Sequence, residues 1–432
     1  MPAGCTVDVP FRVDSDLAKE LAAKYGTPLY VVCESCLRGK MREYRAAFAA
    51  AYDKTELSFA SKANSTLAIL KIAHEEGLLI DAASEGEMRA ALLAGVSASS
   101  IEFHGNNKSE EEIVFALGQG VRTIIADNFE ELDTLSHLWR PEYSTRVVLR
   151  LAPGVDPHTQ EKISTGQDDT KFGFNVSNGH AERALLKALG AGLPVAGFHC
   201  HVGSQLLDPQ AQINGGETLA SFALAMFENH GFVADVINLG GGLGIQYAGD
   251  ERPVAVDDYC ARLVRAVLSC LKGSALRPTL IQEPGRSLVG ACGITLYTVG
   301  VVKSVPTHSG PKVYVVVDGG LADNPRPVMY GARFGVEALR RSNAAPMPCT
   351  VSGRHCETDK LFPNVELPGD VTRGDLIQVL STGAYNSSMA SNYNRYPRPA
   401  TVLLREGGSH CLIQRRENWT DMFARELMPE DL

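Results

Sequence analysis

The chain has 432 residues, of which 44% are hydrophobic and 21% charged, so it can bury a core in one or two folded domains. The 41 Lys and Arg residues against 50 Asp and Glu residues give a net charge of −9. This charge argues against nucleic-acid and anionic-membrane partners and favours a small-molecule ligand. No apolar run approaches the roughly 18 residues that cross a bilayer, and residues 1–10 lack a signal-peptide pattern. We therefore expect a cytoplasmic protein.

The ten cysteines are too sparse for a disulfide scaffold, so we interpret them as free thiols of a reducing compartment. Cys33 and Cys36 form a C-x-x-C pair, but no second pair or histidine follows at the spacing of a zinc site. The simpler interpretation is that a helix begins here. No metal site is predicted.

From about residue 56 to residue 285, short apolar or β-branched runs alternate with longer amphipathic stretches. About eight runs are typical of strands: Glu56–Ser61, Leu78–Ala82, Ile101–His104, Arg122–Ala126, Arg146–Leu151, Val195–His201, Ala234–Leu239 and Thr279–Glu283. Helical patterns lie between them, such as SEGEMRAALLAG, in which Ser84 and Glu87 are spaced as in a capping box. The alternation predicts a closed (β/α)8 barrel of the TIM type. An open doubly wound sheet would need a glycine-rich turn after its first strand, and the sequence has none there.

After residue 290 the pattern changes to strand-like runs broken by Gly and Pro, at Ile294–Val302, Lys312–Val317, Leu376–Leu380 and Thr401–Leu404. These runs predict a separate β domain. We expect the barrel to comprise residues 35–288, and a β-sandwich or β-barrel-like domain to comprise residues 1–34 and 289–432.

Polar residues of unusual type follow the C-terminal ends of the predicted strands. They are Lys62, Asp81, His104, Arg150, His201, the run Gly240, Gly241 and Gly242, and Glu283. In a barrel these strand ends share one face, which is the face where active sites are built. The sequence therefore predicts an active site formed by several strand ends.

A lysine directly after a buried strand is desolvated, which disfavours its ammonium form and makes its amine able to form a Schiff base. Lys62 has this position, although a snorkelling or ion-paired lysine would also explain it. The glycine run at 240–242 lets backbone N–H groups approach an anion, and loops after the late strands of such barrels commonly hold phosphate. A flexible turn is the alternative for these glycines.

A phosphate beside a Schiff-base lysine indicates pyridoxal 5′-phosphate, whose ring acts as an electron sink. Glu283 is placed to hold the proton of the ring nitrogen through a charge-assisted hydrogen bond. The alternative for Glu283 is a salt bridge to Arg286. His201 can lie flat against the ring, and its alternative is a buried histidine with satisfied hydrogen bonds.

With these residues the chain resembles the fold type III pyridoxal-phosphate decarboxylases, and among them the diaminopimelate decarboxylases. The resemblance covers nearly the whole chain. The matching motifs are SKAN at Lys62, GEM within DAASEGEM, FHGNNKS from Phe103, ISTG from Ile163, KFGF from Lys171, HCHVGSQ from His199, GGGLG, EPGR, RPVMY from Arg326, CET from Cys356 and GAYNSSMASNYNRYPRP from Gly383.

The resemblance implies a role for each matched residue. Lys62 would form the Schiff base, His201 would stack on the ring and Glu283 would pair with its nitrogen. The phosphate would be held by Ser204, Gly240, Gly241, Gly242 and Tyr385. Asp81 and Arg150 are expected to contact the cofactor from their positions at strand ends. The distal carboxylate of the substrate would be bound by Arg286, Arg326 and Tyr330, with Tyr385 in the same site, and the distal ammonium by Glu357. Cys356 would deliver a proton after carbon dioxide leaves and would reach the neighbouring subunit's site, which implies a homodimer with shared active sites.

The implied activity is decarboxylation of meso-2,6-diaminopimelate to L-lysine and carbon dioxide, in lysine biosynthesis. A grip of two arginines and a tyrosine favours a dicarboxylic substrate, because an amino acid without that carboxylate would leave the donors unsatisfied. The alternatives are a decarboxylase of D-ornithine, D-lysine, carboxynorspermidine or an acyl-carrier-bound amino acid, and a non-catalytic regulatory homologue. An amino-acid racemase with the same barrel is a further alternative. The EPGR glutamate, Glu283, and the segment Cys356–Glu357 resemble the decarboxylases more than the alanine racemases, in which an arginine pairs with the ring nitrogen. The chain departs from the family at CETDK, where one residue is missing between Glu357 and Asp359.

Overall fold

The computed structural model describes residues 9–432 except 156–169, 248, 250, 309 and 359. The chain forms two compact units. Residues 38–245 and 252–288 form one, called the barrel unit here, and residues 1–37, 246–251 and 289–432 form the other, called the β unit.

The barrel unit is built on eight parallel strands. They are β2 (Thr55–Ala60), β3 (Leu79–Ala82), β4 (Ile101–Phe103), β5 (Thr123–Ala126), β6 (Arg146–Ala152), β8 (Val195–His199), β9 (Val236–Asn238) and β10 (Thr279–Gln282). Their order is β5-β4-β3-β2-β10-β9-β8-β6, and pairing of β5 with β6 closes the barrel. The two-residue strand β7 (Phe174–Asn175) pairs with β6. Each of the eight overlaps a run that the sequence predicts to be a strand, so the predicted (β/α)8 barrel is confirmed.

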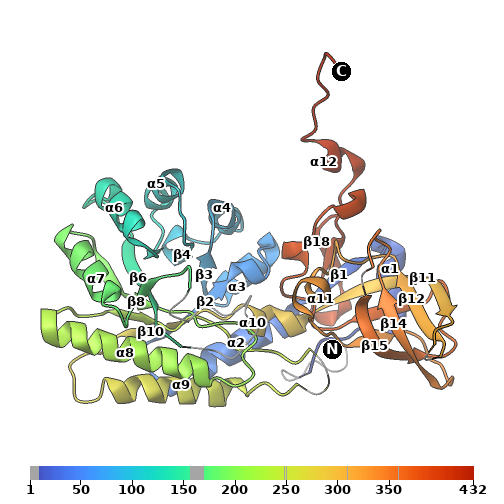
Figure 1. The fold of residues 1–432 in the computed structure, drawn as a ribbon, viewed down its shortest axis with the longest axis horizontal. Helices are drawn as coiled ribbons and strands as arrows, with labels where there is room; N and C mark the ends of the chain where they lie inside the picture. The colour runs from blue at the N-terminus through green and yellow to red at the C-terminus, as the bar shows by residue number, and fades with distance from the viewer. Residues whose placement is uncertain (1–8, 156–169, 248, 250, 309, 359) are drawn as a thin grey trace. The chain divides into compact units, whose positions relative to one another are not determined.

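Helices connect these strands and lie outside them (Figure 1). They are α2 (Glu34–Ala51), α3 (Leu67–Glu75), α4 (Glu85–Leu93), α5 (Glu110–Gln119), α6 (Phe129–Leu138), α7 (His180–Gly190), α8 (Gln210–His230), α9 (Val256–Cys270) and α10 (Arg286–Val289). Helix α4 begins as predicted, with Ser84 Oγ accepting from Glu87 N–H at 3.2 Å. The Glu87 carboxylate accepts from Ala83 N–H at 2.7 Å, so the reciprocal bond is made one residue earlier than in a standard capping box.

The barrel interior has an apolar layer below a polar layer. The apolar layer consists of Leu79, Ile125, Val148, Ala196, Val236 and Ile281. Because strand residues alternate between faces, the residue two positions further along a strand faces the interior again. In five of these strands that residue is polar and buried, namely Asp81, Asp127, Arg150, Asn238 and Glu283. The apolar layer thus supports a buried polar layer at the C-terminal mouth of the barrel.

The β unit contains one nine-stranded sheet. Its strands are β1 (Leu29–Cys33), β11 (Gly293–Val305), β12 (Lys312–Val317), β13 (Val336–Ala338), β14 (Pro346–Ser352), β15 (Lys360–Pro368), β16 (Leu376–Val379), β17 (Ala400–Leu404) and β18 (His410–Gln414). Their order is β15-β14-β12-β11-β1-β17-β18, and β16 pairs with β11 and β13. The helices of this unit are α1 (Ser15–Tyr25), α11 (Arg326–Tyr330) and α12 (Trp419–Phe423). The predicted second β domain is therefore confirmed, including strands in all four predicted runs.

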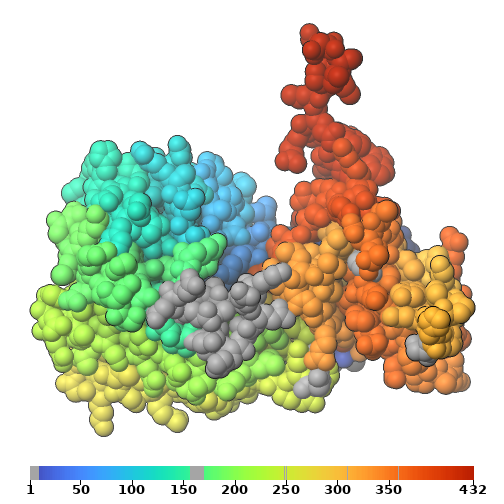
Figure 2. All heavy atoms as spheres, in the orientation of Figure 1, coloured from blue at the N-terminus to red at the C-terminus, as the bar shows by residue number. Residues whose placement is uncertain are grey.

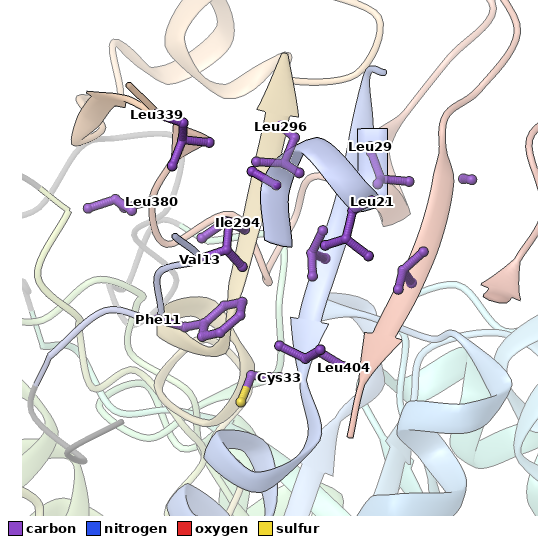
Figure 3. Close-up of a cluster of buried hydrophobic side chains, with 14 residues drawn as sticks. Phe11, Val13, Leu21, Leu29, Cys33, Ile294, Leu296, Leu339, Leu380 and Leu404 are labelled. Atoms are coloured by element: carbon purple, nitrogen blue, oxygen red, sulfur yellow. The ribbon is translucent and has the colours of Figure 1, made fainter. Parts of the chain in front are cut away.

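Both ends of the chain contribute to the core of the β unit. Phe11, Val13 and Leu21, which precede the barrel in sequence, pack with Ile294 and Leu296 of β11 (Figure 3). Strand β1 lies between β11 and β17, with Leu29 opposite Leu296 on one side and Ala400 on the other. Residues before and after the barrel sequence therefore form one sheet.

The last residues of the chain carry exposed apolar side chains. Helix α12 starts with a capping box between Asn418 and Asp421, and the chain after it extends away from the rest of the β unit (Figure 2). The exposed fraction is 63% for Trp419 and 92% for Leu427. A surface of this kind is typical of protein contacts.

Helix α2 begins directly after Cys33, as the helix-start interpretation of the C-x-x-C pair predicts. Eight of the described cysteines are free thiols. Cys36 is disulfide-bonded, so the interpretation of all cysteines as free thiols is wrong at this position. In the described part of the chain, no helix combines the length and the apolar character needed to span a membrane.

Candidate active site

Glu283, directly after β10, is the centre of a buried polar cluster at the barrel mouth. Asn238 Nδ2 donates to its Oε1 at 2.6 Å, and His199 Nε2 lies 3.0 Å from its Oε2. His104 Nε2 lies 3.0 Å from Oε1 of Glu283 and 3.8 Å from Oδ1 of Asp81. Burial works to raise the pKa of Glu283, but the charge of His104 and the hydrogen bond with His199 hold it well below its ordinary value. The Glu283 side chain is therefore an anion in a buried site.

The two histidines beside Glu283 differ in charge. Burial works to lower the pKa of His104, but the carboxylates of Asp81 and Glu283 raise it above the ordinary value. Burial lowers the pKa of His199 to about 4. The Nδ1 atom of His199 is buried and has no hydrogen-bond partner among the described residues, so a second proton on this ring would find no acceptor there. His104 is thus the cationic neighbour of Glu283, and His199 is a neutral one.

Lys62 follows β2 in the short 3₁₀ turn η1 (Ser61–Ala63). Its side chain is exposed, so the expectation of a lysine desolvated by burial is wrong. The reason is that Lys62 lies beyond the last interior position of β2, whereas Ser61 and Ala63 beside it are buried. Its positive charge works to lower the pKa of both Asp81 and His201. The amine is therefore at the barrel mouth, close to these two side chains.

His201, two residues after β8, is joined to the glycine run after β9. Its Nδ1 accepts a hydrogen bond from Gly241 N–H at 3.3 Å, which places the ring proton on Nε2. Burial, and next the charge of Lys62, lower the pKa of His201 well below its ordinary value. The imidazole is therefore neutral and fixed in one tautomer.

The glycines of this run are required by their surroundings. A Cβ at Gly240 would lie 2.3 Å from the carbonyl oxygen of Cys200, and one at Gly241 would lie 2.1 Å from that of Glu283. Gly240 and Gly242 also have positive φ, at 64° and 141°. The run is thus a fixed loop rather than the flexible turn considered from the sequence.

Arg286, which begins α10, donates from Nη2 to Ser204 Oγ at 3.1 Å. The structure therefore brings together two predicted site residues from the loops after β10 and β8. Arg150 of β6 lies at the same mouth, with its Nε 3.8 Å from Asp127 Oδ1 and its guanidinium carbon 4.1 Å from the ring centroid of Phe172.

Three further predicted residues meet in the β unit. The guanidinium carbon of Arg326 lies 5.0 Å from the ring centroid of Tyr330 and 5.2 Å from that of Tyr385. Both distances are in the range of cation–π contacts. Arg326 is buried although it begins a short helix, so its charge is held in a defined place.

Cys356 and Glu357 lie in an exposed part of the β unit. The Cys356 N–H donates to Asn394 Oδ1 at 2.9 Å, and the Tyr393 hydroxyl donates to the Glu357 carboxylate. Asn394 has a left-handed backbone with φ 52°. Asp359 of the shortened CETDK motif and the ISTG motif at Ile163 lie outside the described residues.

Three residues of the cluster have no role predicted from the sequence: His104, which is predicted only as a polar strand-end residue, and His199 and Asn238, which are not among the predicted site residues. His199 was quoted within HCHVGSQ, but only His201 was given a function. Strand periodicity indicates Asn238, which is two positions after the interior residue Val236. It does not indicate His199, because the pairing of β8 with β6 has a register shift and His199 is three positions after the interior residue Ala196.

Comparisons with known proteins show the family of the chain. The family profile described as "Pyridoxal-dependent decarboxylase, pyridoxal binding domain" matches residues 37–290. A diaminopimelate decarboxylase of Bacillus subtilis is 42% identical over 416 residues, which cover 94% of this chain and 93% of that protein.

Solved structures give the same result. The diaminopimelate decarboxylase of M. jannaschii in complex with L-lysine has a TM-score of 0.88 at 34% identity, with 96% of this chain and 95% of that chain covered. The diaminopimelate decarboxylase of Helicobacter pylori, also complexed with L-lysine, has a TM-score of 0.84 at 31% identity, with 94% and 98% covered. The chain therefore belongs to the pyridoxal-dependent decarboxylases and, within them, to the diaminopimelate decarboxylase family.

Proposed function

We propose that this protein decarboxylates meso-2,6-diaminopimelate to L-lysine and carbon dioxide, with pyridoxal 5′-phosphate as its cofactor. The observation that carries the proposal is the buried anionic Glu283 at the mouth of the barrel, with Lys62 and His201 at the same mouth. Full-length similarity to diaminopimelate decarboxylases supports the choice of substrate.

The residues at the barrel mouth fit this cofactor. A pyridine nitrogen that keeps its proton needs a carboxylate that stays ionised in a buried place, and Glu283 meets that requirement. His201 is a neutral imidazole, which can lie against an aromatic ring without adding positive charge. The fixed glycine loop and the Ser204 hydroxyl provide backbone N–H and O–H groups of the kind that bind phosphate.

Each of these side chains would have one task at the cofactor. Pyridoxal 5′-phosphate supplies a sink for the electron pair that remains when the α-carboxylate departs as carbon dioxide. Glu283 would hold a proton at the ring nitrogen, and Lys62 would anchor the cofactor covalently through its Nζ. Asp81 and Arg150 would line the cofactor site from β3 and β6.

The substrate end would be built from arginine and tyrosine side chains. Arg326, held by the rings of Tyr330 and Tyr385, would offer a guanidinium fork to the distal carboxylate, and Arg286 would add a second one. Glu357 would accept from the distal ammonium group. An amino acid that lacks the distal carboxylate would leave these buried donors unsatisfied, which is the physical basis of the proposed selectivity.

Cys356 would deliver the proton that replaces the lost carboxylate, from Sγ to the α-carbon. We further propose a homodimer in which Cys356 of one subunit serves the site of the other, in the cytoplasm. The exposed apolar side chains of the C-terminal segment support a protein contact; they are Trp419, Phe423, Leu427, Met428 and Leu432.

We also propose the cofactor-binding domain at residues 35–288 and the β domain at residues 1–34 and 289–432.

A substrate panel tests the proposal. Carbon dioxide release by the purified holoenzyme should be fast with meso-2,6-diaminopimelate and at least about 100-fold slower with D-lysine or D-ornithine. Equal rates would reject the distal-carboxylate assignment and favour a broader decarboxylase. Release from none of these acids, with cofactor bound, would favour the non-catalytic homologue.

The position of the cofactor has a separate test. Borohydride reduction of the holoenzyme followed by peptide mass mapping should find the reduced cofactor on Lys62. Lys62→Ala should remove the label, whereas Lys71→Ala, which changes an exposed lysine of α3, should leave it in place. A label on any other residue would contradict the assignment.

A further inference from the structure

We propose that His104 is a positioning residue whose positive charge decides where the proton between Glu283 and the cofactor's ring nitrogen rests. The inference depends on the proposed pairing of Glu283 with that nitrogen. It gives a function to a strand-end histidine for which the sequence analysis found none.

The three neighbours of Glu283 contribute different interactions. Asn238 donates an aligned hydrogen bond at 2.6 Å, and His199 reaches the other carboxylate oxygen at 3.0 Å. His104 Nε2 also lies 3.0 Å from Oε1, but it is not aligned for a hydrogen bond. Asn238 and His199 therefore orient the carboxylate, whereas His104 acts on it mainly through charge.

The charge environment of His104 supports a cationic ring. The ring faces two carboxylates, Asp81 from β3 at 3.8 Å and Glu283 from the loop after β10. The third nearby acid, Glu102 of β4, has a pKa raised to about 7 by burial and by the charge of Glu283. The other basic groups at the mouth are Lys62 and Arg150, whose charges act on Asp81, Glu283, His199 and His201. The structure thus places His104 between two acids and leaves His199 neutral.

A cation in contact with a carboxylate lowers the basicity of that carboxylate. When Glu283 shares a proton with a ring nitrogen, lower basicity at Glu283 moves the proton toward nitrogen. The protonated nitrogen is the form that makes the ring an effective electron sink. Without the charge of His104, the same proton would rest more on the Glu283 oxygen, and the ring would become neutral. The neutral His199 acts on Glu283 through its hydrogen bond, an interaction that a Gln side chain can also make.

The test compares two matched variants, His104→Gln and His199→Gln. Each keeps a side-chain N–H donor, but only the first removes a positive charge. The holoenzyme is prepared with cofactor labelled with ¹⁵N in its ring, and the ¹⁵N chemical shift reports whether that nitrogen is protonated. We expect the protonated shift in the wild type and in His199→Gln, and a displacement toward the unprotonated shift in His104→Gln. The kcat of His104→Gln should fall about 10-fold or more with little change in KM.

The outcomes separate this inference from the proposed function. Glu283→Gln is the reference variant, because it removes the proposed carboxylate partner of the ring nitrogen. A ¹⁵N chemical shift that is the same in Glu283→Gln as in the wild type would contradict the proposed role of Glu283 itself. A shift that responds to Glu283→Gln but is the same in His104→Gln as in the wild type would overturn the inference about His104. An equal displacement in His199→Gln would also overturn it, because hydrogen bonding rather than charge would then be responsible.

A measurement on the wild-type holoenzyme covers the case in which His104→Gln does not fold. The ring carbon and proton shifts of His104 and His199 should show a charged His104 and a neutral His199 near pH 7. A neutral His104 would overturn the inference. The donor atoms of His104, His199 and Glu283 lie within 4.8 Å of one another, so a signal that changes on adding a chelator would assign the three residues to a metal ion instead and would also overturn it.

Discussion

The N–H group of Gly241 donates a hydrogen bond to Nδ1 of His201 at 3.3 Å. This contact joins the loop after β9 to the imidazole after β8. On its other side, Gly241 lies so close to Glu283 that a Cβ would be 2.1 Å from the Glu283 carbonyl oxygen. One glycine therefore sets the relative positions of two side chains that we propose to act on the cofactor ring.

Gly241→Ala should therefore damage both the stability of the barrel and the binding of cofactor. The new methyl group has no room, and overpacking of this kind costs about 1–3 kcal/mol or more. Gly39→Ala is the matched control, because Gly39 lies within α2 and a Cβ there would meet nothing within 4 Å. The control should be neutral or slightly stabilising, by up to about 1 kcal/mol. Thermal unfolding and cofactor content measure the two effects, and equal behaviour of the variants would contradict the steric argument.

Glu283→Ala should lose turnover by a factor of at least about 100. Without the carboxylate, the ring nitrogen has no anion to hold its proton, and His104 and His199 lose their common partner. Absorbance should show that cofactor remains bound, because Lys62 and the glycine loop are unchanged. A variant with cofactor bound and wild-type kcat would reject the assignment of Glu283.

The buried Glu102 should give the protein a pH-dependent stability. Burial, and next the charge of Glu283, raise its pKa from 4.5 to about 7. The native state then holds this proton more tightly than the unfolded chain, so the free energy of unfolding should fall as the pH rises from about 4.5 to about 7. The contribution is on the order of 3 kcal/mol.

Glu102→Gln should reduce this dependence, because an amide cannot ionise. The free energy of unfolding is measured across this pH range for the wild type, for Glu102→Gln and for Glu110→Gln, which changes an exposed residue of α5. The difference between wild type and Glu102→Gln should grow with pH. A difference that stays constant would show that Glu102 does not titrate in this range.

The sequence predicts the barrel well because its signals are local. Each strand run is short and apolar, and the polar residues at the ends of several runs lie two positions beyond an interior residue, as at Leu79 and Asp81. Strand β1 was not among the predicted runs. It forms part of the β unit by pairing with β11 and β17, more than 250 residues away, and such long-range pairing leaves no local pattern.

In the candidate site, too, local features could be predicted from the sequence and long-range contacts could not. Lys62, His201 and Glu283 could be selected from their positions after strands. The network around Glu283, however, joins His104 directly after β4 with His199 of β8 and Asn238 of β9, which are distant in sequence. The opposite pKa shifts of His104 and His199 go with the Asp81 carboxylate near the first ring and with the Nδ1 atom of the second, which has no hydrogen-bond partner within the described part of the chain. These facts come from tertiary contacts and could not be read from residue types.

Arg326 should determine the preference for a dicarboxylic substrate. Arg326→Met removes the charge between Tyr330 and Tyr385 and should raise KM for meso-2,6-diaminopimelate about 10- to 100-fold, the effect of losing a charge-assisted hydrogen bond. Arg326→Lys keeps the charge but not the planar fork, so its KM should be intermediate. Arg341→Met, which changes an exposed arginine of the same unit, is the control. If Arg326→Met behaved like this control, the carboxylate would be bound elsewhere.

Shared active sites should be visible in mixtures of inactive subunits. Lys62→Ala and Cys356→Ala each remove one proposed participant, Lys62 from the barrel unit and Cys356 from the β unit. If one subunit supplies Lys62 and the other supplies Cys356 to each site, a mixed dimer contains one intact site. Equal mixing after subunit exchange should then restore about a quarter of the wild-type activity, because half of the dimers are mixed and each has one of two sites intact.

The control mixes Lys62→Ala with Glu283→Ala. Both changes lie in the barrel unit, so a mixed dimer of this kind has a damaged cofactor site in each subunit and should stay inactive. Activity in the first mixture but not in the second would show that Cys356 acts across the subunit boundary. Absence of activity in the first mixture, with subunit exchange confirmed by native mass spectrometry, would mean that Cys356 serves the site of its own subunit. The proposed dimer would then have two independent sites, and its exposed C-terminal segment would make a contact without completing the chemistry.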